Sequence, residues 1–361
     1  MGPTTIALYA ALLPGLCLVT TTGPLRDIAI YLHAFGLAWL LFFQTSSSSP
    51  QQGSDMYNLR HVMFNLEIPP KTLWFNMGLW DANESGGINS DNGKSSDDDR
   101  CHMKYSDACE KLVEAVLERM EMKHASNVLD VGYGCGDSCF MLADRYECKV
   151  TGLTNEISQW RVSQQRLQAS PSPVARQRND RINFLCASAT DDKLSSVIDK
   201  FGPFDHIISI DSAYHYVTRW KFLQAALYHL LPGGTLGLYD LTVHPSLLVK
   251  QRTRWIAEIV GRYVLGIPKE NMVTAEAYRD RLEAMGYAQV EVEPVPADRV
   301  FGGLSRFIRR QYAQAEAWDI LPPFANRMFM LASASLFGLL ARKQWVVPVI
   351  VSGRRRAYAS C

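Results

Sequence analysis

Three glycines at alternate positions, Gly132, Gly134 and Gly136, are the residues whose spacing first suggests chemistry. They follow a short apolar run, residues 128–131, that predicts a buried strand, and they precede an amphipathic run, residues 140–143, that predicts a helix. A strand, a glycine-rich turn and a helix N-terminus form the usual ligand cradle of a doubly wound α/β sheet. Because glycine allows positive φ and a close approach of backbone to ligand, the stretch predicts a cofactor site; a turn without a ligand is the alternative.

The spacing of these glycines separates two cofactor classes. It is G-x-G-x-G rather than the G-x-G-x-x-G of dinucleotide-binding turns, and Asp130 lies two residues before the first glycine. This arrangement resembles motif I of class I S-adenosylmethionine (SAM)-dependent methyltransferases. In that family the glycines pass under the methionine moiety, and the acid at the strand end helps to hold its amino group. The resemblance implies SAM as the cofactor, bound by Asp130 and the three glycines.

The next apolar run, residues 149–154, predicts a second strand that ends at Thr154 and Asn155. Nucleotide-binding α/β folds often place an acid at this point for the ribose hydroxyls. The chain instead resembles the "G-x-T…Q" variant of tocopherol, sterol and cyclopropane-type methyltransferases, with Gln159 matching the glutamine. This resemblance implies cofactor contacts for Thr154, Asn155 and Gln159, while Glu156 is a weaker ribose candidate.

A third strand is predicted at residues 182–186. Members of the family usually follow it with Gly-Asp-Ala, whose acid meets the adenine amino group. This chain has Ala-Ser-Ala, so the resemblance places Ser188 and Ala189 near the adenine. Either Ser188 takes a weaker hydrogen-bonding role or Asp191 shifts into the acid's place, and the sequence leaves both open.

A fourth strand, predicted at residues 204–210, is followed by Asp-Ser-Ala-Tyr-His. Ligand and catalytic groups gather at the carboxyl ends of parallel strands. The segment resembles the "E-S-x-x-H" segment of small-molecule methyltransferases, with Asp211 for the glutamate and His215 for the histidine. We expect Asp211 on the cofactor side of the site. If the methyl acceptor is a hydroxyl, His215 fits a general base by type and position.

Two further residues are candidates for the catalytic group. Asp240 follows a predicted fifth strand, residues 235–239, so it could lie beside His215 and orient the ring. Some sugar and small-molecule O-methyltransferases use such a His–Asp pair. Tyr214, next to the histidine, is the third candidate catalytic residue. The alternative is that His215 only hydrogen-bonds substrate or cofactor.

The elements that position these residues predict an α/β fold. An alternating run at residues 289–293 predicts strand six, and a β-branched run at residues 345–352 predicts strand seven. Residues 74–356 resemble a class I methyltransferase, which implies a Rossmann-like seven-stranded sheet with the last strand antiparallel. Helical lid insertions are expected at about 243–286 and 295–344. The apolar clusters in the second insertion are individually too short to span a bilayer.

An aromatic segment, residues 74–80, precedes the first strand. It resembles the "N-x-G-x-W" segment that caps the cofactor in many small-molecule methyltransferases. Aromatic rings suit that role, because a ring face attracts a sulfonium cation. A plain hydrophobic anchor for the N-terminal extension is the alternative.

The N-terminal region is expected to form a membrane anchor over residues 1–45. It contains two apolar runs, residues 4–22 and 28–43, and a spanning helix needs roughly 20 apolar residues. No Lys or Arg precedes the first run, so a secretory signal peptide fits poorly. A membrane hairpin or an interfacial anchor is favoured over apolar helices packed on the domain. Residues 46–73 then form a linker, and residues 74–361 form the methyltransferase domain.

Composition limits the other function classes. The net charge is +1, so no global basic field suggests nucleic acid. The eight cysteines contain no C-x-x-C pair, which favours reduced thiols and no metal site. Spacing of the glycines and the missing acid after the second strand disfavour a Rossmann oxidoreductase.

The sequence therefore predicts methyl transfer from SAM to a small, lipophilic metabolite, as in secondary metabolism, with O-methylation favoured. N- or C-methylation remains open, as does a catalytically silent SAM-binding membrane scaffold. We expect the protein at a membrane, with the endoplasmic reticulum as the candidate. The catalytic domain should face the cytosol, where SAM is available.

Overall fold

The computed structural model describes most of the predicted methyltransferase domain. The residues described are 72–81, 103–169, 173–191, 198–249, 258, 261–262, 265–317 and 324–357. The predicted anchor, residues 1–45, and all but the last two residues of the predicted linker, 46–73, lie outside them.

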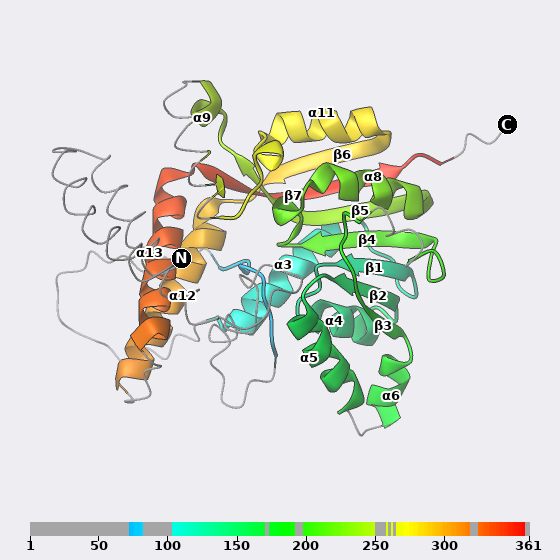
Figure 1. Ribbon diagram of the computed structural model, residues 1–361, viewed down its shortest axis with the longest axis horizontal. Helices are drawn as coiled ribbons and strands as arrows, with labels where there is room; N and C mark the ends of the chain where they lie inside the picture. The colour runs from blue at the N-terminus through cyan, green and yellow to red at the C-terminus, as the bar shows by residue number, and fades with distance from the viewer. Residues whose placement is uncertain are drawn as a thin grey trace, which may run out of the picture.

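Seven strands form a single sheet in the order β3-β2-β1-β4-β5-β7-β6 (Figure 1). β7 pairs antiparallel with both β5 and β6, whereas the other neighbouring strands run parallel. This arrangement confirms the predicted seven-stranded α/β fold. The strands are β1 Asn127–Val131, β2 Lys149–Thr154, β3 Ile182–Cys186, β4 Phe204–Ile210, β5 Leu230–Val243, β6 Tyr287–Pro294 and β7 Val346–Arg355.

Helices cover both faces of the sheet, as Figure 1 shows. Residues of α3, α4, α12 and α13 share one hydrophobic core, and residues of α8 and α11 share the other. The helices are α3 Tyr105–Arg119, α4 Asp137–Arg145, α5 Ile157–Gln168, α6 Pro173–Asn179, α8 Arg219–His229, α9 Pro245–Val249, α11 Ala275–Met285, α12 Gly303–Ala317 and α13 Phe324–Lys343. Shorter helical turns are η4 Ala213–His215, η6 Lys269–Asn271 and η7 Asp298–Gly302.

Local sequence explains where these helices begin and end. α3 buries Leu112 and Val116 one turn apart, as an amphipathic helix should. The Thr274 side chain caps α11 by accepting a hydrogen bond from the Ala277 amide at 3.2 Å. Gly286 ends that helix with φ +111°, a left-handed conformation that favours glycine.

β5 is longer than the sequence predicts. The predicted strand covered residues 235–239, but pairing with β7 continues from Asp240 opposite Val349 to Val243 opposite Val346. The extra residues are held by a strand more than a hundred positions away, which local periodicity does not reveal. Asp240 therefore lies inside a buried strand and not at its end.

The insertion between β6 and β7 is helical, as predicted. α12 and α13 pack on each other, with Ser305 Oγ donating to the Ala334 carbonyl at 2.6 Å. The Phe301 ring of η7 stacks on the Phe337 ring of α13 at 6.2 Å. The two apolar clusters of this insertion lie in one continuous helix of 20 residues, joined by small residues at 332–335. Each cluster alone is too short to span a bilayer, but by length and composition the helix that joins them could cross one.

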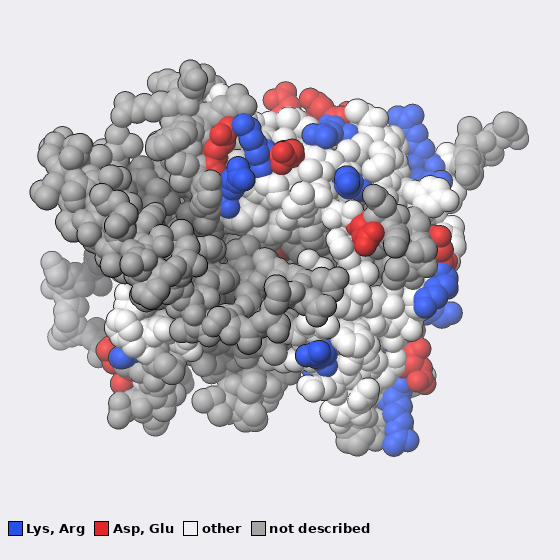
Figure 2. Space-filling view, viewed as in Figure 1, with Lys and Arg blue, Asp and Glu red and all other residues white. Residues whose placement is uncertain are grey.

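Charges are mixed on the face shown in Figure 2. Among the described residues visible there, Lys and Arg side chains stand interspersed with Asp and Glu. This part of the surface carries no continuous patch of one sign, in keeping with the net charge of +1.

Candidate active site

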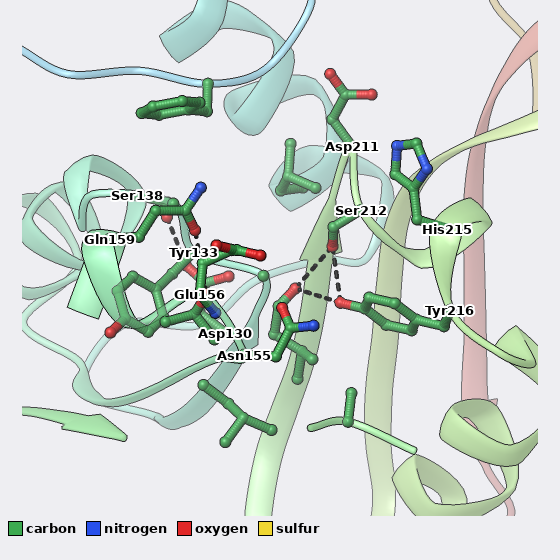
Figure 3. A pocket seen from close by; sticks show the side chains of 18 of the residues that line it. Asp130, Tyr133, Ser138, Asn155, Glu156, Gln159, Asp211, Ser212, His215 and Tyr216 are labelled. Atoms are coloured by element: carbon green, nitrogen blue, oxygen red, sulfur yellow. Dashed lines mark hydrogen bonds between the residues drawn. The ribbon is translucent and has the colours of Figure 1, made fainter. Parts of the chain in front are cut away.

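A cavity of about 300 Å³ lies at the carboxyl ends of the parallel strands. Figure 3 shows labelled side chains from the β1 and β2 ends on one side of it and from the β4 end on the other. Ten of the predicted site residues line the cavity: Asp130, Gly132, Gly134, Thr154, Asn155, Gln159, Ser188, Ala189, Asp211 and His215. Three do not: Gly136, Tyr214 and Asp240.

The three glycines have positive φ for different reasons. A Cβ at Gly132 would overlap the Ser212 side chain, and one at Gly136 would come within 2.9 Å of the Phe184 ring. These two glycines permit close packing. Gly134, at φ +62°, meets only ordinary contacts with Phe75 and lines the cavity. Its backbone is therefore the part of the turn most open to a ligand.

Asp130 lies buried beneath this turn. Its Oδ2 accepts hydrogen bonds from Ser138 Oγ at 2.5 Å and Cys139 Sγ at 3.4 Å. Burial raises the pKa of the Asp130 carboxyl to about 6, although these two donors lower it. A nearby cation would favour the ionised form, so the group suits a positively charged ligand.

The end of β2 presents hydrogen-bonding groups suited to a ribose. Thr154 Oγ1 donates to Gln159 Oε1 at 3.1 Å, so these two predicted residues hold each other. Asn155 is exposed and Glu156 is buried, and both line the cavity. Glu156, a weaker candidate by sequence, supplies an acid at this edge two residues beyond the strand end. The position of Glu156 two residues after a predicted strand end is the feature of the sequence that points to it as a ribose ligand.

The end of β3 distinguishes the two adenine candidates. Ser188, Ala189 and Thr190 line the cavity, whereas Asp191 does not. Ser188 Oγ accepts a hydrogen bond from the Thr190 amide at 3.2 Å, which forms a compact turn. Ser188 is therefore the better placed of the two for a ligand contact.

Asp211 occupies the turn after β4 with φ +58°, a backbone conformation uncommon for a side-chain-bearing residue. Its Oδ1 accepts from the Tyr214 hydroxyl at 2.6 Å, and its Oδ2 accepts from the Met77 amide at 2.8 Å. Burial raises the pKa of the Asp211 carboxyl to about 7. Tyr214, predicted as catalytic, does not line the cavity; its hydroxyl holds Asp211.

His215 lies on η4, half-buried at the cavity wall. Its Nδ1 is 3.1 Å from the Gly266 carbonyl, which can only accept, so the proton lies on Nδ1 and the lone pair on Nε2. Burial, helped by the positive charge of Arg219 and opposed by the hydrogen bond to Gly266, lowers the pKa of the imidazole to about 3. The ring is therefore neutral at neutral pH, as a proton acceptor must be.

The predicted pair of His215 and Asp240 does not form. Asp240 Oδ2 accepts from Arg219 Nη1 and from the Tyr278 hydroxyl, both at 2.7 Å. Its Oδ1 accepts from the Leu241 amide at 2.7 Å. Because β5 continues past Asp240, the carboxylate lies among buried residues, and its partner is a buried arginine instead of the histidine.

Residues 72–81 pass over the cavity as a strap. The Leu73 amide donates to Asp137 Oδ2 at 3.0 Å, and Asn76 Nδ2 donates to the Cys109 carbonyl at 3.1 Å. Trp74 and Phe75 line the cavity. Trp80 is fully buried, with its ring 5.2 Å from that of Phe307 in α12. Trp74 and Phe75 thus stand where a cofactor cap would stand, whereas Trp80 packs in the core against α12.

Sequence reasoning missed a hydroxyl cluster at the β1–β4 junction. Ser212 Oγ and the Tyr216 hydroxyl lie 2.8 Å apart and within 3.1 and 3.2 Å of the Val131 carbonyl (Figure 3). Both side chains line the cavity. Within the described ranges no group of His, Cys, Asp or Glu could hold a metal ion.

Comparison with known families agrees with this geometry. The model of the family described as mycolic acid cyclopropane synthetase matches residues 98–294, more than half of the chain. The chain belongs to this family of SAM-dependent methyltransferases. The family's cofactor is SAM, which confirms the expectation from motif I.

Curated relatives of this chain include enzymes named as O-methyltransferases. Erythromycin 3''-O-methyltransferase of Saccharopolyspora erythraea is 30% identical over 199 residues, which cover 52% of this chain and 59% of that enzyme. The 27-O-demethylrifamycin SV methyltransferase of Amycolatopsis mediterranei is 24% identical, covering 58% of this chain and 68% of that enzyme. The match to the erythromycin enzyme thus spans less than two thirds of its length.

Solved structures show the same fold at low identity. The cyclopropane synthase MmaA2 from Mycobacterium tuberculosis superposes with a TM-score of 0.58 at 16% identity, covering 85% of this chain and all of that one. The [4+2]-cyclase SpnF superposes with a TM-score of 0.57 at 18% identity, covering 84% and 95%. Because proteins named as a synthase and a cyclase share the fold, the fold alone does not fix the reaction.

The chemical groups that line the cavity fit SAM. Two carboxyl groups, that of the buried Asp130 in β1 and that of the partly buried Asp211 after β4, suit the two positive charges of the cofactor. Asn155 and Glu156 offer hydrogen-bonding groups for ribose hydroxyls, and Gly134 leaves room that a side chain would fill. These residues would hold the cofactor.

Proposed function

We propose that this methyltransferase transfers the methyl group of SAM to a hydroxyl group of a small, lipophilic molecule. The observation that carries the proposal is the state of His215 at the cavity wall: its proton lies on Nδ1 toward Gly266, and Nε2 can accept. The relatives named as O-methyltransferases, such as the erythromycin enzyme, support it.

Bound SAM supplies an activated methyl carbon, and the protein supplies proximity and orientation. His215 accepts the hydroxyl proton at Nε2 as the bond between acceptor oxygen and methyl carbon forms and the sulfur–carbon bond breaks. Because burial disfavours imidazolium, we expect the proton to move only once the hydroxyl has become strongly acidic, late in the displacement. Asp211 keeps a carboxyl group at the same cavity to offset positive charge.

Amine methylation is the second candidate. Pavine N-methyltransferase of Thalictrum flavum is 26% identical over 134 residues. An amine acceptor needs little base assistance, and the Asp211 carboxyl with its pKa of about 7 could attract a cationic amine. In that case His215 would position the acceptor without taking its proton.

We also propose that residues 1–45 hold the protein on a membrane, with the catalytic domain on the cytosolic side. The two apolar runs at residues 4–22 and 28–43 support this proposal. A lipophilic acceptor that partitions into the bilayer would then reach the enzyme from the membrane.

Product analysis tests the choice of acceptor atom. The full chain is incubated with SAM carrying a ¹³C-methyl group and with matched acceptors that share one lipophilic skeleton and carry an alcohol, a phenol, an amine or an alkene. We expect a labelled methyl ether from the alcohol or phenol. Label on nitrogen or carbon alone would contradict O-methylation, and SAM binding without any labelled product would indicate a silent scaffold.

A further inference from the structure

One buried side chain binds both backbone carbonyls that flank His215 in its turn. Asn271 Nδ2 donates to the Tyr214 carbonyl at 3.0 Å and to the Tyr216 carbonyl at 2.7 Å, the two carbonyls that flank the histidine. Asn271 has no exposed surface. The same segment supplies the Gly266 carbonyl that accepts from the His215 ring. Residues 266–271 therefore hydrogen-bond to the turn at three points: the carbonyls on both sides of the histidine and the histidine ring itself.

Asn271 is itself held by an ion pair that has no exposed surface. Its Oδ1 accepts from the Arg219 amide at 3.1 Å, and its carbonyl accepts from Arg219 Nη2. Arg219 Nη1 in turn donates to Asp240 Oδ2 in β5 at 2.7 Å. Trp220 Nε1 adds a bond to the Glu270 carbonyl at 2.8 Å. The clamp on the turn is thus anchored to the central sheet.

The chemistry of the clamp requires an amide. Asparagine is short and offers two N–H donors and one oxygen acceptor on a single planar group, and here both donors and the oxygen are used. Alanine would leave two buried carbonyls without a donor, and serine has a single donor to share between them. Aspartate would place a carboxylate, which can only accept hydrogen bonds, against two carbonyl oxygens that also only accept.

We propose that Asn271 is a positioning residue for methyl transfer: by clamping the Tyr214 and Tyr216 carbonyls, it fixes the position of the His215 ring at the cavity wall. Asp240, expected from the sequence to touch the histidine, acts on it only through Arg219 and Asn271. The inference rests on the proposed role of His215 as proton acceptor. Asn271 does not line the cavity, so its effect on cofactor binding should be small.

Kinetics of Asn271→Ala and Asn271→Ser test the inference. Loss of alignment at the reacting atoms should lower kcat by about 10- to 100-fold, with the serine variant less affected, while KM for SAM stays close to wild type. Tyr287→Phe is the matched control, because it removes a buried hydroxyl that donates to the Leu223 carbonyl at 2.8 Å, away from the clamp. Its kcat should stay near wild type. Equal losses in the control and in Asn271→Ala would overturn the inference.

Nuclear magnetic resonance of ¹⁵N-histidine gives a readout that does not depend on turnover. The His215 signals are assigned by their loss in His215→Ala. In wild type we expect the proton on Nδ1, and in Asn271→Ala a mixture of tautomers or a broadened signal. A wild-type proton on Nε2, or an unchanged signal with unchanged kcat in Asn271→Ala, would overturn the clamp. If no methyl ether forms with any acceptor, the proposed function fails, but the spectra still decide the clamp.

Discussion

Asp211 and Asp130 are the cavity carboxyl groups whose acidity the fold changes most. Burial raises their pKa values from 3.8 to about 7 and about 6. Each group is ionised above its own pKa and neutral below it, so the negative charge available to a cationic ligand is lost as pH falls through 7 and then 6. Binding of a cationic ligand would favour the ionised forms of both carboxyl groups, and protons would be released.

This pH dependence leads to a prediction about ligand charge. SAM affinity should fall as pH drops from 8 to 5.5, approaching about tenfold per pH unit where one carboxyl must lose its proton to bind. S-adenosylhomocysteine lacks the sulfonium charge and should lose less. Titration calorimetry across pH measures both, and Asp211→Asn should flatten the SAM profile near pH 7. Parallel profiles for the two ligands would show that these carboxyls do not face the sulfonium.

A second prediction concerns the contribution of Asp240 to the stability of the fold. Removing its charge leaves the fully buried Arg219 without a counter-ion, since the pair is 0% exposed on both sides. Asp240→Asn should lower the free energy of unfolding by about 3–5 kcal/mol, measured by denaturant unfolding. Asp81→Asn is the control, because its ion pair with Lys111 is half-exposed and should cost about 1 kcal/mol or less. Similar losses of unfolding free energy in both variants would show that the buried ion pair contributes no more to stability than the exposed one.

Residues next to a strand end could be placed from the sequence. Asp130, Thr154 and Asp211 lie in or just after short apolar runs that local pattern predicts as strands, and the resemblance to class I methyltransferases implied that these strand ends meet at one edge of the sheet. The partner of Asp240 could not be placed. It depends on how α8, which supplies Arg219, and α11, which supplies Tyr278, pack against β5.

At the scale of elements, the glycine-rich turn between β1 and α4 allows a matched test. Gly134 and Gly233 both have positive φ, +62° and +82°, so valine should strain the backbone at either site. A Cβ at Gly233 meets nothing within 4 Å, whereas Gly134 lines the cavity. We predict that Gly134→Val abolishes SAM binding while the domain stays folded, and that Gly233→Val keeps it. Calorimetry decides; unchanged affinity in Gly134→Val would remove the turn from the cofactor site.

The positions of strands could be predicted from the sequence where hydrophobic residues form a clear local pattern. The predicted strands at residues 182–186 and 204–210 match β3 and β4 residue for residue. The end of β5 and the continuity of α13 did not follow. The end of β5 depends on a tertiary partner, because pairing with β7 carries the strand past Asp240. In α13 the small residues at 332–335 separate the two apolar clusters that the sequence reading took singly.

At the scale of the whole molecule, the membrane proposal concerns the first 45 residues. Two apolar runs of near-spanning length should partition into a bilayer, so the full chain should pellet with membranes. A chain starting at Gln51 should remain soluble with unchanged SAM affinity. Because α13 is also long and apolar, partial membrane binding of the truncated chain would assign part of the affinity to that helix. Equal solubility of both chains would end the anchor proposal.

The central claim, that His215 accepts a proton during methyl transfer, is tested most directly by single-turnover kinetics of His215→Ala with a hydroxylated acceptor. Loss of a general base should lower the rate by about 10² to 10⁴, with SAM affinity nearly unchanged. His206→Ala is the control, because His206 is a buried histidine with a pKa lowered to about 4 near the opposite end of β4. Its rate should stay close to wild type. Near-normal turnover in His215→Ala would contradict the account and assign the histidine a structural role.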